Sequence, residues 1–466
     1  MTSIWWIRRD VRLGDNPALQ AALLRGAVIP VFILDPHLLT KTPVRRQCFL
    51  FDGLHVLHRQ LLERGSRLLL CRGNPQEVLA GLMQQFDVQA IFAEEDFTPY
   101  ARARDARISS SLPLQLIHGQ TVLHPLLLHK ADGLPYTVFT PFSRTWKSLL
   151  PSDLAALPVP SVFPAIPGSV ADSEGPELNL GLRSTSDETL FPSGESEALR
   201  RLAVFVDHNI YGYASQRDRM DLDGTSSLSP YLRFGMLSMR QAVVAAQQAM
   251  RTAPDAQTLL AAATWLNELI WREFYISILY HFPHVSQTAF NQSLASIPWR
   301  DSEHDFNAWT AGLTGVPIVD AGLRQLSATG WMHNRARMIV ASYLVKDLLI
   351  NWQWGERWFM QNLLDGDPAA NNGGWQWTAG TGTDAAPYFR IFNPVLQSQK
   401  FDPNGFYIRK WVPELASLPT TVIHAPWERG VHVASYPRNP LVEHALVKDR
   451  TLKAYAFSKK LHAMGK

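Results

Sequence analysis

The sequence predicts an α/β domain with a parallel, Rossmann-like sheet, followed by a larger all-helical domain. Two observations support this prediction. Runs typical of buried strands alternate with helical stretches over residues 1 to 130, whereas long helical patterns without strands fill residues 195 to 466. Residues 131 to 194 predict a linker, because residues 151 to 192 are rich in proline, serine and glycine and show little periodicity.

The first domain is expected to consist of βαβ units. Four runs are typical of buried strands, namely "SIWWI", "AVIPVFILD", "SRLLLC" and "VQAIFAEE". Asn16-Pro17 is a favourable helix start, and an apolar stripe at helical spacing follows at Leu50, Leu54, Leu57 and Leu61. Such units imply a parallel sheet with a ligand crevice at its strand ends, although no glycine-rich phosphate fingerprint follows the first strand.

Composition indicates a globular protein of the reducing cytoplasm. Hydrophobic residues make up 46% and charged residues 18%, and there is no unbroken apolar run of membrane-spanning length. The start turns charged too early for a signal peptide, and two cysteines cannot form a disulfide framework. The net charge of +3 does not by itself predict nucleic-acid binding. His55 and His58 have no third ligand nearby, so we expect no metal site.

The stretch "DGTSSLSPYLRFG" concentrates hydroxyl groups at an expected helix start. Thr225, Ser226, Ser227 and Ser229 precede or adjoin Pro230, which suits the first helical position. Hydroxyls and free backbone N–H groups at such a start form an anion site suited to phosphate. The alternative is an ordinary capped helix.

Two further helical stretches place polar side chains among apolar ones. In "TWLNELIWREFY", Trp265, Glu268 and Arg272 share one helix face, so Glu268 is either an internal ion-pair partner or a polar group in a pocket. In "TGWMHNRARM", Arg335 and Arg337 lie around one turn, and their alternative is a solvated face of an amphipathic helix.

The densest polar and aromatic stretch is "DGDPAANNGGWQWTAGTGTDAAPYF", residues 365 to 389. It carries two acids, two adjacent amides, several glycines and two tryptophans that flank a single glutamine. Neither core periodicity nor an ordinary surface loop explains this pattern. We therefore expect a flat polar ligand here.

In combination, these stretches closely resemble the photolyase and cryptochrome family of flavoproteins, and within it the microbial class I enzymes that repair cyclobutane pyrimidine dimers. The resemblance rests on "WIRRDVRLGDN", "GTSSLSPYLRFG", "WLNELIWREFY", "GVPIVDAGLRQLSATGWMHNRARM" and "DGDPAANNGGWQWTAGTGTDAAPYFRIFNP". It covers nearly the whole chain, is weakest in the linker, and is specific because the motifs occur together in this order.

The resemblance implies that the flat ligand is FAD, bound in a U shape in the helical domain. The FAD-binding positions it implies are Tyr213, Thr225, Ser226, Ser227, Leu228, Ser229, Trp265, Arg272, Arg337, Asp365, Asp367 and Asn371. Asn371 is expected to face flavin N5, where an amide supports the fully reduced, anionic flavin and a carboxylate would repel it. Plant cryptochromes resembling this family carry an acid at that position.

The implied reaction is light-driven electron transfer from reduced FAD to a dimer that has left the DNA stack, followed by ring cleavage and return of the electron. The implied substrate and DNA positions are Arg217, Glu268, Trp271, Arg272, Asn334, Arg335, Met338, Trp377, Arg390 and Gln397. Phosphate contacts of this kind give affinity without sequence preference. Trp375, Trp352 and Trp299 match a chain that conducts electrons to oxidised flavin, with aromatic core packing as the alternative.

The expected partner is UV-damaged DNA, with no membrane, no obligate protein partner and a monomeric state. Enzymes of this superfamily that repair 6-4 photoproducts show histidines where this chain has Asn334 and Met338, which favours the cyclobutane dimer. A blue-light-sensing cryptochrome and a 6-4 photolyase remain alternatives. The alternative of a nicotinamide oxidoreductase is supported only by the first-domain sheet and by "GTGTDA". No predicted strand precedes that motif. If an antenna chromophore binds the first domain, "AEEDFTPYARARD" resembles relatives that take a deazaflavin or a second flavin more than those that bind folate.

Overall fold

The computed structural model describes residues 1–164 and 190–464, so much of the predicted linker lies outside the described residues. The described chain forms two compact units. Unit 1 comprises Met1–Tyr136, Thr140–Tyr211 and Ser226–Tyr280, and unit 2 comprises Thr137–Phe139, Gly212–Thr225 and His281–Lys466. Within the part of the chain that the structure describes, no helix combines the length and the apolar character needed to cross a bilayer.

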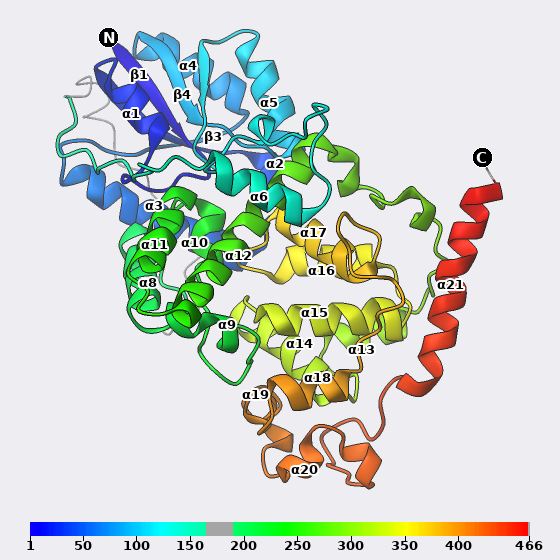
Figure 1. The fold of residues 1–466 in the computed structure, drawn as a ribbon. Coiled ribbons are helices and arrows are strands. Elements are labelled where there is room, and N and C mark those ends of the chain that lie inside the picture. The colour runs from blue at the N-terminus through cyan, green and yellow to red at the C-terminus, as the bar shows by residue number, and fades with distance from the viewer. Residues whose placement is uncertain (165–189, 465–466) are drawn as a thin grey trace. The chain divides into compact units, whose positions relative to one another are not determined.

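Unit 1 contains the predicted parallel sheet (Figure 1). Its strand order is β3-β2-β1-β4-β5. In its centre, Ile4 of β1 pairs with Ile29 of β2 on one side and with Ile91 of β4 on the other. From β1 the chain builds the sheet first toward β3 and then, starting with β4, toward the opposite edge. Sheets of this kind form a ligand crevice at this switch point, at the carboxyl ends of the two central strands. The strands are β1 (Thr2–Ile7), β2 (Ala27–Leu34), β3 (Leu69–Arg72), β4 (Val88–Glu94) and β5 (Leu114–Ile117).

Charged side chains occupy the carboxyl end of β1 and β4. Arg8 Nη1 lies 2.6 Å from Asp105 Oδ2, and Arg12 Nη2 lies 2.7 Å from Glu94 Oε1, with all four side chains at most 6% exposed. Burial raises the pKa of Glu94 to about 7, against the opposing effect of Arg12. These buried ion pairs occupy the region that holds a glycine-rich phosphate loop in dinucleotide-binding folds.

The helices of unit 1 surround this sheet or follow it in the chain. Asn16 caps the first of them, its Oδ1 accepting from Leu19 N at 2.9 Å, as the Asn16-Pro17 pair predicts. The helices are α1 (Pro17–Leu23), α2 (Pro36–Leu39), α3 (Val44–Leu62), α4 (Pro75–Gln85), α5 (Pro99–Ser109), α6 (Phe139–Leu149), α8 (Glu195–His208), α10 (Ser229–Phe234), α11 (Met239–Arg251) and α12 (Ala256–His281). Unit 1 includes α6 from Thr140 onward and α12 as far as Tyr280.

A buried carboxylate joins α12 to two other parts of unit 1. Glu273 accepts hydrogen bonds from Val122 N and from Trp146 Nε1, each at 2.5 Å. Burial raises the pKa of Glu273 to about 7. Helix α12 is therefore fixed to α6 and to the segment after β5, and it carries several of the predicted site residues.

Unit 2 is all helical among its described residues. Its core gathers buried aliphatic and aromatic side chains from α13 to α19, including Trp309, Trp352 and Trp375. In the π-helical turn η5 (Tyr343–Asp347), buried Lys346 donates to Ala379 O at 2.9 Å and to Tyr455 Oη at 2.8 Å. The helices are α9 (Tyr213–Gln216), α13 (Glu303–Thr310), α14 (Pro317–Thr329), α15 (Asn334–Ser342), α16 (Trp352–Asn362), α17 (Pro368–Ala379), α18 (Pro394–Phe401), α19 (Phe406–Trp411), α20 (Thr420–Ile423) and α21 (His444–Met464).

Candidate functional site

Helices α16 and α17 form the framework of the candidate site in unit 2 and pack side by side (Figure 1). Helix α17 begins at a side-chain cap, because Asp367 Oδ1 accepts from Ala369 N at 2.9 Å. The two helices approach closely at Gly355, where an added Cβ atom would lie 2.1 Å from Trp375 Cη2. The buried Trp375 ring therefore packs directly against the backbone of α16 at Gly355.

Asn371, the residue expected at flavin N5, has a defined amide orientation. Its side-chain nitrogen donates to the backbone oxygen of Glu356 at 3.0 Å. Because a backbone carbonyl can only accept, the contacting atom must be Nδ2 and not Oδ1. The Asn371 Oδ1 atom is therefore not used in this contact and can accept a hydrogen bond from a ligand N–H group.

Glu356 holds the side-chain amides of both Asn371 and Asn372. Its backbone oxygen accepts from Asn371, and its carboxylate Oε1 accepts from Asn372 Nδ2 at 2.9 Å. The same Asn372 nitrogen donates to Val285 O at 2.9 Å, and Asn372 Oδ1 accepts from Gln376 Nε2 at 3.1 Å. Burial raises the pKa of Glu356 to about 7, against the opposing hydrogen bond from Asn372. This polar network fixes one face of α17, and the sequence prediction did not include Glu356 in it.

A Glu356→Gln variant is expected to show a different dependence of stability on pH. Because the folded pKa is raised to about 7 from an ordinary value of 4.5, the folded state binds more protons between these two values. Relative to the variant, the wild-type protein should therefore lose stability as pH rises through this range, by about 3 kcal/mol at most. Denaturant unfolding at several pH values measures the difference. Glu303→Gln, at an exposed position, is the control, and parallel curves for Glu356→Gln and wild type would contradict the assignment.

Only one of the two carboxylate oxygens of Asp365 has a hydrogen-bond partner among the described residues. Its Oδ2 accepts from Arg337 Nη2 at 2.8 Å, and Arg337 Nε donates in turn to Met332 O at 2.8 Å. Asp365 Oδ1 is buried and has no hydrogen-bond partner among the described residues. A buried acceptor without a donor is unfavourable, so this atom suits a ligand N–H or O–H group.

Gly374 provides space on the helix face that carries Asn371. It is exposed, and a Cβ atom added to it would meet nothing within 4 Å. Because the two residues are three apart in α17, they share one face. A flat ring can approach this face without a clash, and the Asn371 amide and the unpaired Asp365 Oδ1 are acceptors of the kind that a flavin requires.

The predicted substrate residues of α15 lie at its start. His333 caps this helix by accepting from Arg335 N at 3.1 Å, and Asn334, the first residue, is exposed. Arg335 forms an ion pair with Asp218 at 2.8 Å and lies 4.4 Å from the ring centroid of Phe401. Asn334 is therefore presented to the surface, whereas the charge of Arg335 is neutralised within unit 2.

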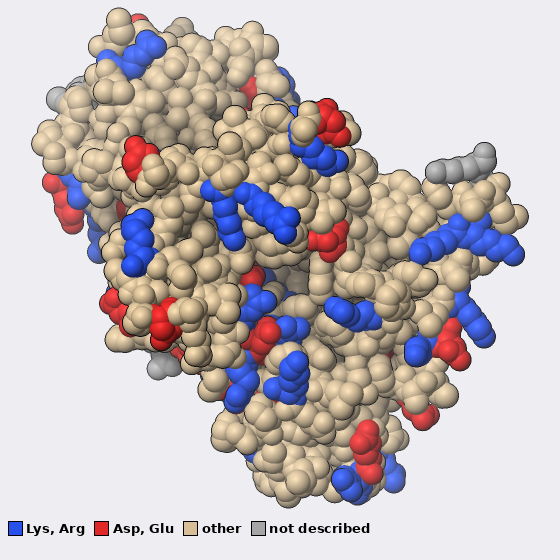
Figure 2. Space-filling model, viewed as in Figure 1, with Lys and Arg blue, Asp and Glu red and all other residues tan. Residues whose placement is uncertain are grey.

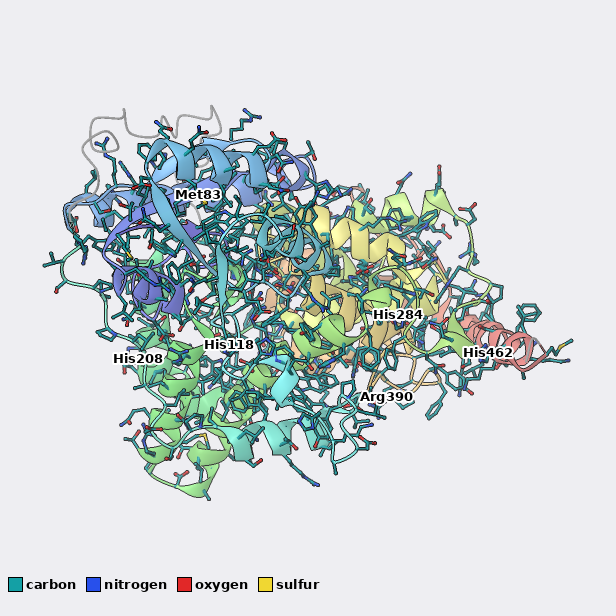
Figure 3. The ribbon with its side chains drawn as sticks, turned by 90° about the horizontal axis from the view of Figure 1, so that it is seen from above. Met83, His118, His208, His284, Arg390 and His462 are labelled. Atoms are coloured by element: carbon teal, nitrogen blue, oxygen red, sulfur yellow. The ribbon has the colours of Figure 1, made fainter. Side chains whose placement is uncertain are left out.

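The remaining predicted residues of unit 2 are spread over several elements. Tyr213 is the buried first residue of α9 and Arg217 follows the end of that helix, while Met338 is half-buried in α15. Trp377 is half-buried in α17, and Gln397 lies in α18. Arg390 is exposed in the loop between α17 and α18, and Figure 3 labels it.

In unit 1, the predicted residues lie on α10, on α12 and just before α10. Ser229 is the first residue of α10, Leu228 holds the cap position, and no side-chain hydrogen bond caps the helix. Neither Ser226 nor Ser227 serves as the cap, so α10 begins without a side-chain cap. Ser227 has a positive φ of 50°, which is uncommon for a residue with a side chain and turns the backbone sharply ahead of α10.

The predicted residues of α12 differ in burial. Trp265 is 2% exposed and lies 4.9 Å from the ring of Phe205. Glu268, Trp271 and Arg272 are half-buried, and Arg272 Nη2 donates to Leu232 O at 3.1 Å. Thr225, which belongs to unit 2, is also half-buried.

The three predicted electron-transfer tryptophans all contact the core of unit 2. Trp375 and Trp352 are 2% and 3% exposed, and Trp299 is partly buried against the same core. Trp299 also makes an edge contact with Tyr455, with ring centroids 6.0 Å apart. Trp375 Nε1 is buried and has no hydrogen-bond partner among the described residues, so no acceptor lies ready to take its proton.

Two family models match the chain. The model described as "DNA photolyase" matches residues 3–161, and the model described as "FAD binding domain of DNA photolyase" matches residues 265–457. These two parts are the parallel sheet domain and the helical region that holds Asn371, Asp365 and Trp375. The chain belongs to the DNA photolyase family, and FAD is its cofactor.

Full-length relatives agree with this assignment. The deoxyribodipyrimidine photo-lyase of Salmonella typhimurium is 40% identical, with 98% of this chain and 99% of the relative covered. A class III photolyase from Agrobacterium tumefaciens has a similar structure, with a TM-score of 0.89, 37% identity and 98% of each chain covered. An archaeal photolyase from Sulfolobus tokodaii, solved with two FAD molecules, gives a TM-score of 0.85 at 32% identity, covering 98% of this chain and 100% of that one.

Proposed function

We propose that the protein repairs cyclobutane pyrimidine dimers in DNA with light energy. The observation that carries this proposal is the oriented Asn371 amide beside the open face at Gly374, in a chain that is similar over nearly its whole length to deoxyribodipyrimidine photo-lyases. Bound FAD supplies the electron that opens the cyclobutane ring and takes it back afterwards. We also propose that the enzyme acts as a monomer in the cytoplasm without an obligate protein partner.

The residues predicted for FAD hold and tune the cofactor in this proposal. Asn371 Oδ1 accepts the flavin N5 hydrogen, an interaction that an aspartate would replace with repulsion of the anionic reduced ring. Asp365 Oδ1 would accept a second flavin hydrogen bond, while Arg337 holds the Asp365 carboxylate in place. Tyr213 and the hydroxyls and amides of residues 225 to 229 bind the phosphates.

The remaining site residues bind the lesion. Glu268 and Asn334 donate or accept hydrogen bonds at the bases of the extruded dimer, and Glu268 stabilises charge on the dimer by sharing a proton. The apolar walls are Trp271, Trp377 and Met338. The residues placed along the DNA strand are Arg217, Arg272, Arg335, Arg390 and Gln397.

Repair of a defined dimer tests the proposal directly. The purified, anaerobically reduced protein is mixed with a thymine-dimer oligonucleotide and illuminated with blue light, and the recovery of base absorbance is compared with a dark control. Recovery in the light alone supports dimer repair. No recovery from a protein that holds photoreducible FAD would overturn the proposal in favour of a 6-4 photolyase or a photoreceptor, and a 6-4 photoproduct substrate separates these two.

Glu268→Ala is expected to lower the yield of repair per absorbed photon more than it lowers the FAD content. The reason is that Glu268 is assigned to the dimer and not to the cofactor. Repair yield and the flavin absorbance of the same preparation are measured together. Loss of FAD with an unchanged yield per bound flavin would place Glu268 in the cofactor scaffold.

Dimer-DNA affinity is expected to fall with salt, and Arg390→Ala should reduce the magnitude of the log–log salt slope by about 1. Arg390 is exposed, so its charge can replace a counterion on DNA. On the face drawn in Figure 2, basic and acidic side chains are interspersed among the described residues, so individual arginines matter more than total charge. Fluorescence titration at several salt concentrations measures the slope. Arg429→Ala, at another exposed position of unit 2, is the control, and equal effects of the two variants would contradict the assignment.

A further inference from the structure

A pocket of about 640 Å³ lies within unit 2, and none of the residues assigned above to FAD, the dimer, DNA or electron transfer lines it. Its walls come mostly from η5, from the start of α18, from the 3-10 helix η7 (Pro426–Arg429) and from residues between 439 and 445, which lead into α21. Small-molecule sites in proteins typically measure roughly 300–1,000 Å³. The pocket is therefore large enough for a small organic ligand.

The inner part of the pocket is apolar. Val316 and Tyr343 line it and are each 2% exposed, and Pro394 is also buried. Trp427 and Val442 line it as well, partly buried against the core of unit 2. Side chains of this kind bind a flat apolar group, because contact removes both surfaces from water and an indole ring offers a face for stacking. A ligand for this pocket should therefore carry an aromatic ring.

The hydroxyl group of Tyr343 adds a polar atom to this apolar part. It is buried and lies near the backbone N–H group of Val442, but it makes no well-oriented hydrogen bond to any described residue. A buried oxygen in this state is stabilised when a ligand N–H group donates to it. The ring of the ligand should therefore carry an N–H group.

The exposed rim of the pocket carries negative charge. Glu428 and Glu443 line it and are exposed, and neither forms an ion pair with another described residue. No lysine or arginine of the described chain lines the pocket. His444 lines it, but its Nδ1 lies 2.5 Å from Asp347 Oδ1, so Asp347 balances any charge on the imidazole ring. The two glutamates therefore favour a cation over an anion.

The lining favours an organic cation over a metal ion. Across residues 1–164 and 190–464, no three His, Cys, Asp or Glu side chains come together as a metal-binding group. An ammonium ion needs no such group, because a single carboxylate can pair with it and the face of a tryptophan ring also attracts it.

We propose that this pocket binds a cationic heteroaromatic amine. The ring of the ligand packs against Trp427 and donates its N–H group to Tyr343 Oη, while the ammonium group lies at the rim with Glu428 and Glu443. A ligand of this class combines an apolar ring, an N–H donor and a positive charge, and the lining residues complement all three. The site is independent of the proposed function, because the two share no lining residue.

Isothermal titration calorimetry of the FAD-loaded protein in the dark tests the proposal, with tryptamine as the probe. Phenethylamine has a similar ammonium group but no N–H group on its ring, and indole-3-propionate has the same ring but the opposite charge. We expect tryptamine to bind more tightly than phenethylamine by roughly 2- to 10-fold, the typical effect of one hydrogen bond. Indole-3-propionate should show no binding.

Three variants assign the binding to this pocket. Tyr343→Phe deletes only the hydroxyl group, so it should remove the preference for tryptamine over phenethylamine. Glu428→Gln and Glu443→Gln should each weaken tryptamine binding by roughly two- to fivefold, as expected for exposed charge pairs. Glu303→Gln, which alters an exposed acid of unit 2 outside the pocket, should bind tryptamine like wild type. Circular dichroism shows whether each variant is folded, and light-driven dimer repair should be equal in all the glutamine variants.

Absence of tryptamine binding at millimolar concentrations would overturn the proposal, and so would equal binding of indole-3-propionate. Unchanged tryptamine affinity in the Glu428→Gln/Glu443→Gln double variant would place the binding elsewhere on the protein. A Mg²⁺ titration whose heat disappears in the double variant, without any tryptamine binding to wild type, would assign the two glutamates to a metal ion instead. Dimer repair by the same preparations is measured separately, so failure of this proposal is distinguishable from failure of the proposed function.

Discussion

Replacing Gly355 with alanine is expected to destabilise the protein by roughly 1–3 kcal/mol and to slow photoreduction of FAD. The added methyl group would lie 2.1 Å from Trp375 Cη2, so either α16 or the indole ring must move. Neither can move freely, because the buried Trp375 ring packs against Phe359 and Trp309. Denaturant unfolding gives the change in stability, and absorbance under blue light gives the photoreduction rate.

Gly81→Ala is the matched control for this experiment. Gly81 also lies within a helix, α4, but a Cβ atom there meets nothing within 4 Å. Alanine at this position should stabilise the protein by roughly 0.5–1 kcal/mol and leave photoreduction unchanged. If both alanine variants behaved alike, contact with Trp375 would not explain the effect at Gly355.

Asp365→Ala is expected to weaken FAD binding by about 1.5–3 kcal/mol, or roughly 10- to 150-fold in Kd. The variant lacks the buried Oδ1 acceptor assigned to the cofactor and leaves Arg337 without its carboxylate partner. Titration of the apoprotein with FAD, followed by flavin fluorescence, measures the change.

Asp365→Asn separates the two effects of that substitution. Asparagine retains an oxygen that can accept from Arg337 or from the cofactor, but it lacks the negative charge. Its Kd should therefore lie between those of wild type and Asp365→Ala. Unchanged FAD affinity in both variants, with normal folding, would remove Asp365 from the cofactor site.

The sequence predicted the sheet well where strands are buried on both faces, and less well at the edge. Strand β4 is almost wholly buried and matches the run "VQAIFAEE". Strand β5 was missed, because Gln115 interrupts its four residues, Leu114 to Ile117, and leaves no continuous apolar run, unlike the run that predicts β3 at the other edge. The division into domains at residues 130 and 195 stays a prediction, although α8 does begin at Glu195.

The site could be predicted where a motif contains the functional side chain, but not where support comes from a neighbouring helix. Asn371 lies inside the dense polar stretch, whereas Glu356, which holds it through a backbone oxygen, lies 15 residues earlier in a run of tryptophans. A carboxylate in the aromatic run "WQWGERWF" was the available signal, of the same kind that identified Glu268. Trp309 gave no such signal, because its contact with Trp375 depends on tertiary packing alone.

The ion pair between Arg335 and Asp218 bears on how quickly such an enzyme can survey a genome. An arginine already neutralised by its own chain displaces few counterions from DNA, so it adds little to the affinity for undamaged sequence. Weak attachment shortens each visit to an intact site and leaves the protein free to sample the next. Recognition of a rare lesion then depends on contacts that form only when the dimer enters the pocket. The residence time of the protein on DNA thus distinguishes a damaged site from the large excess of intact sites.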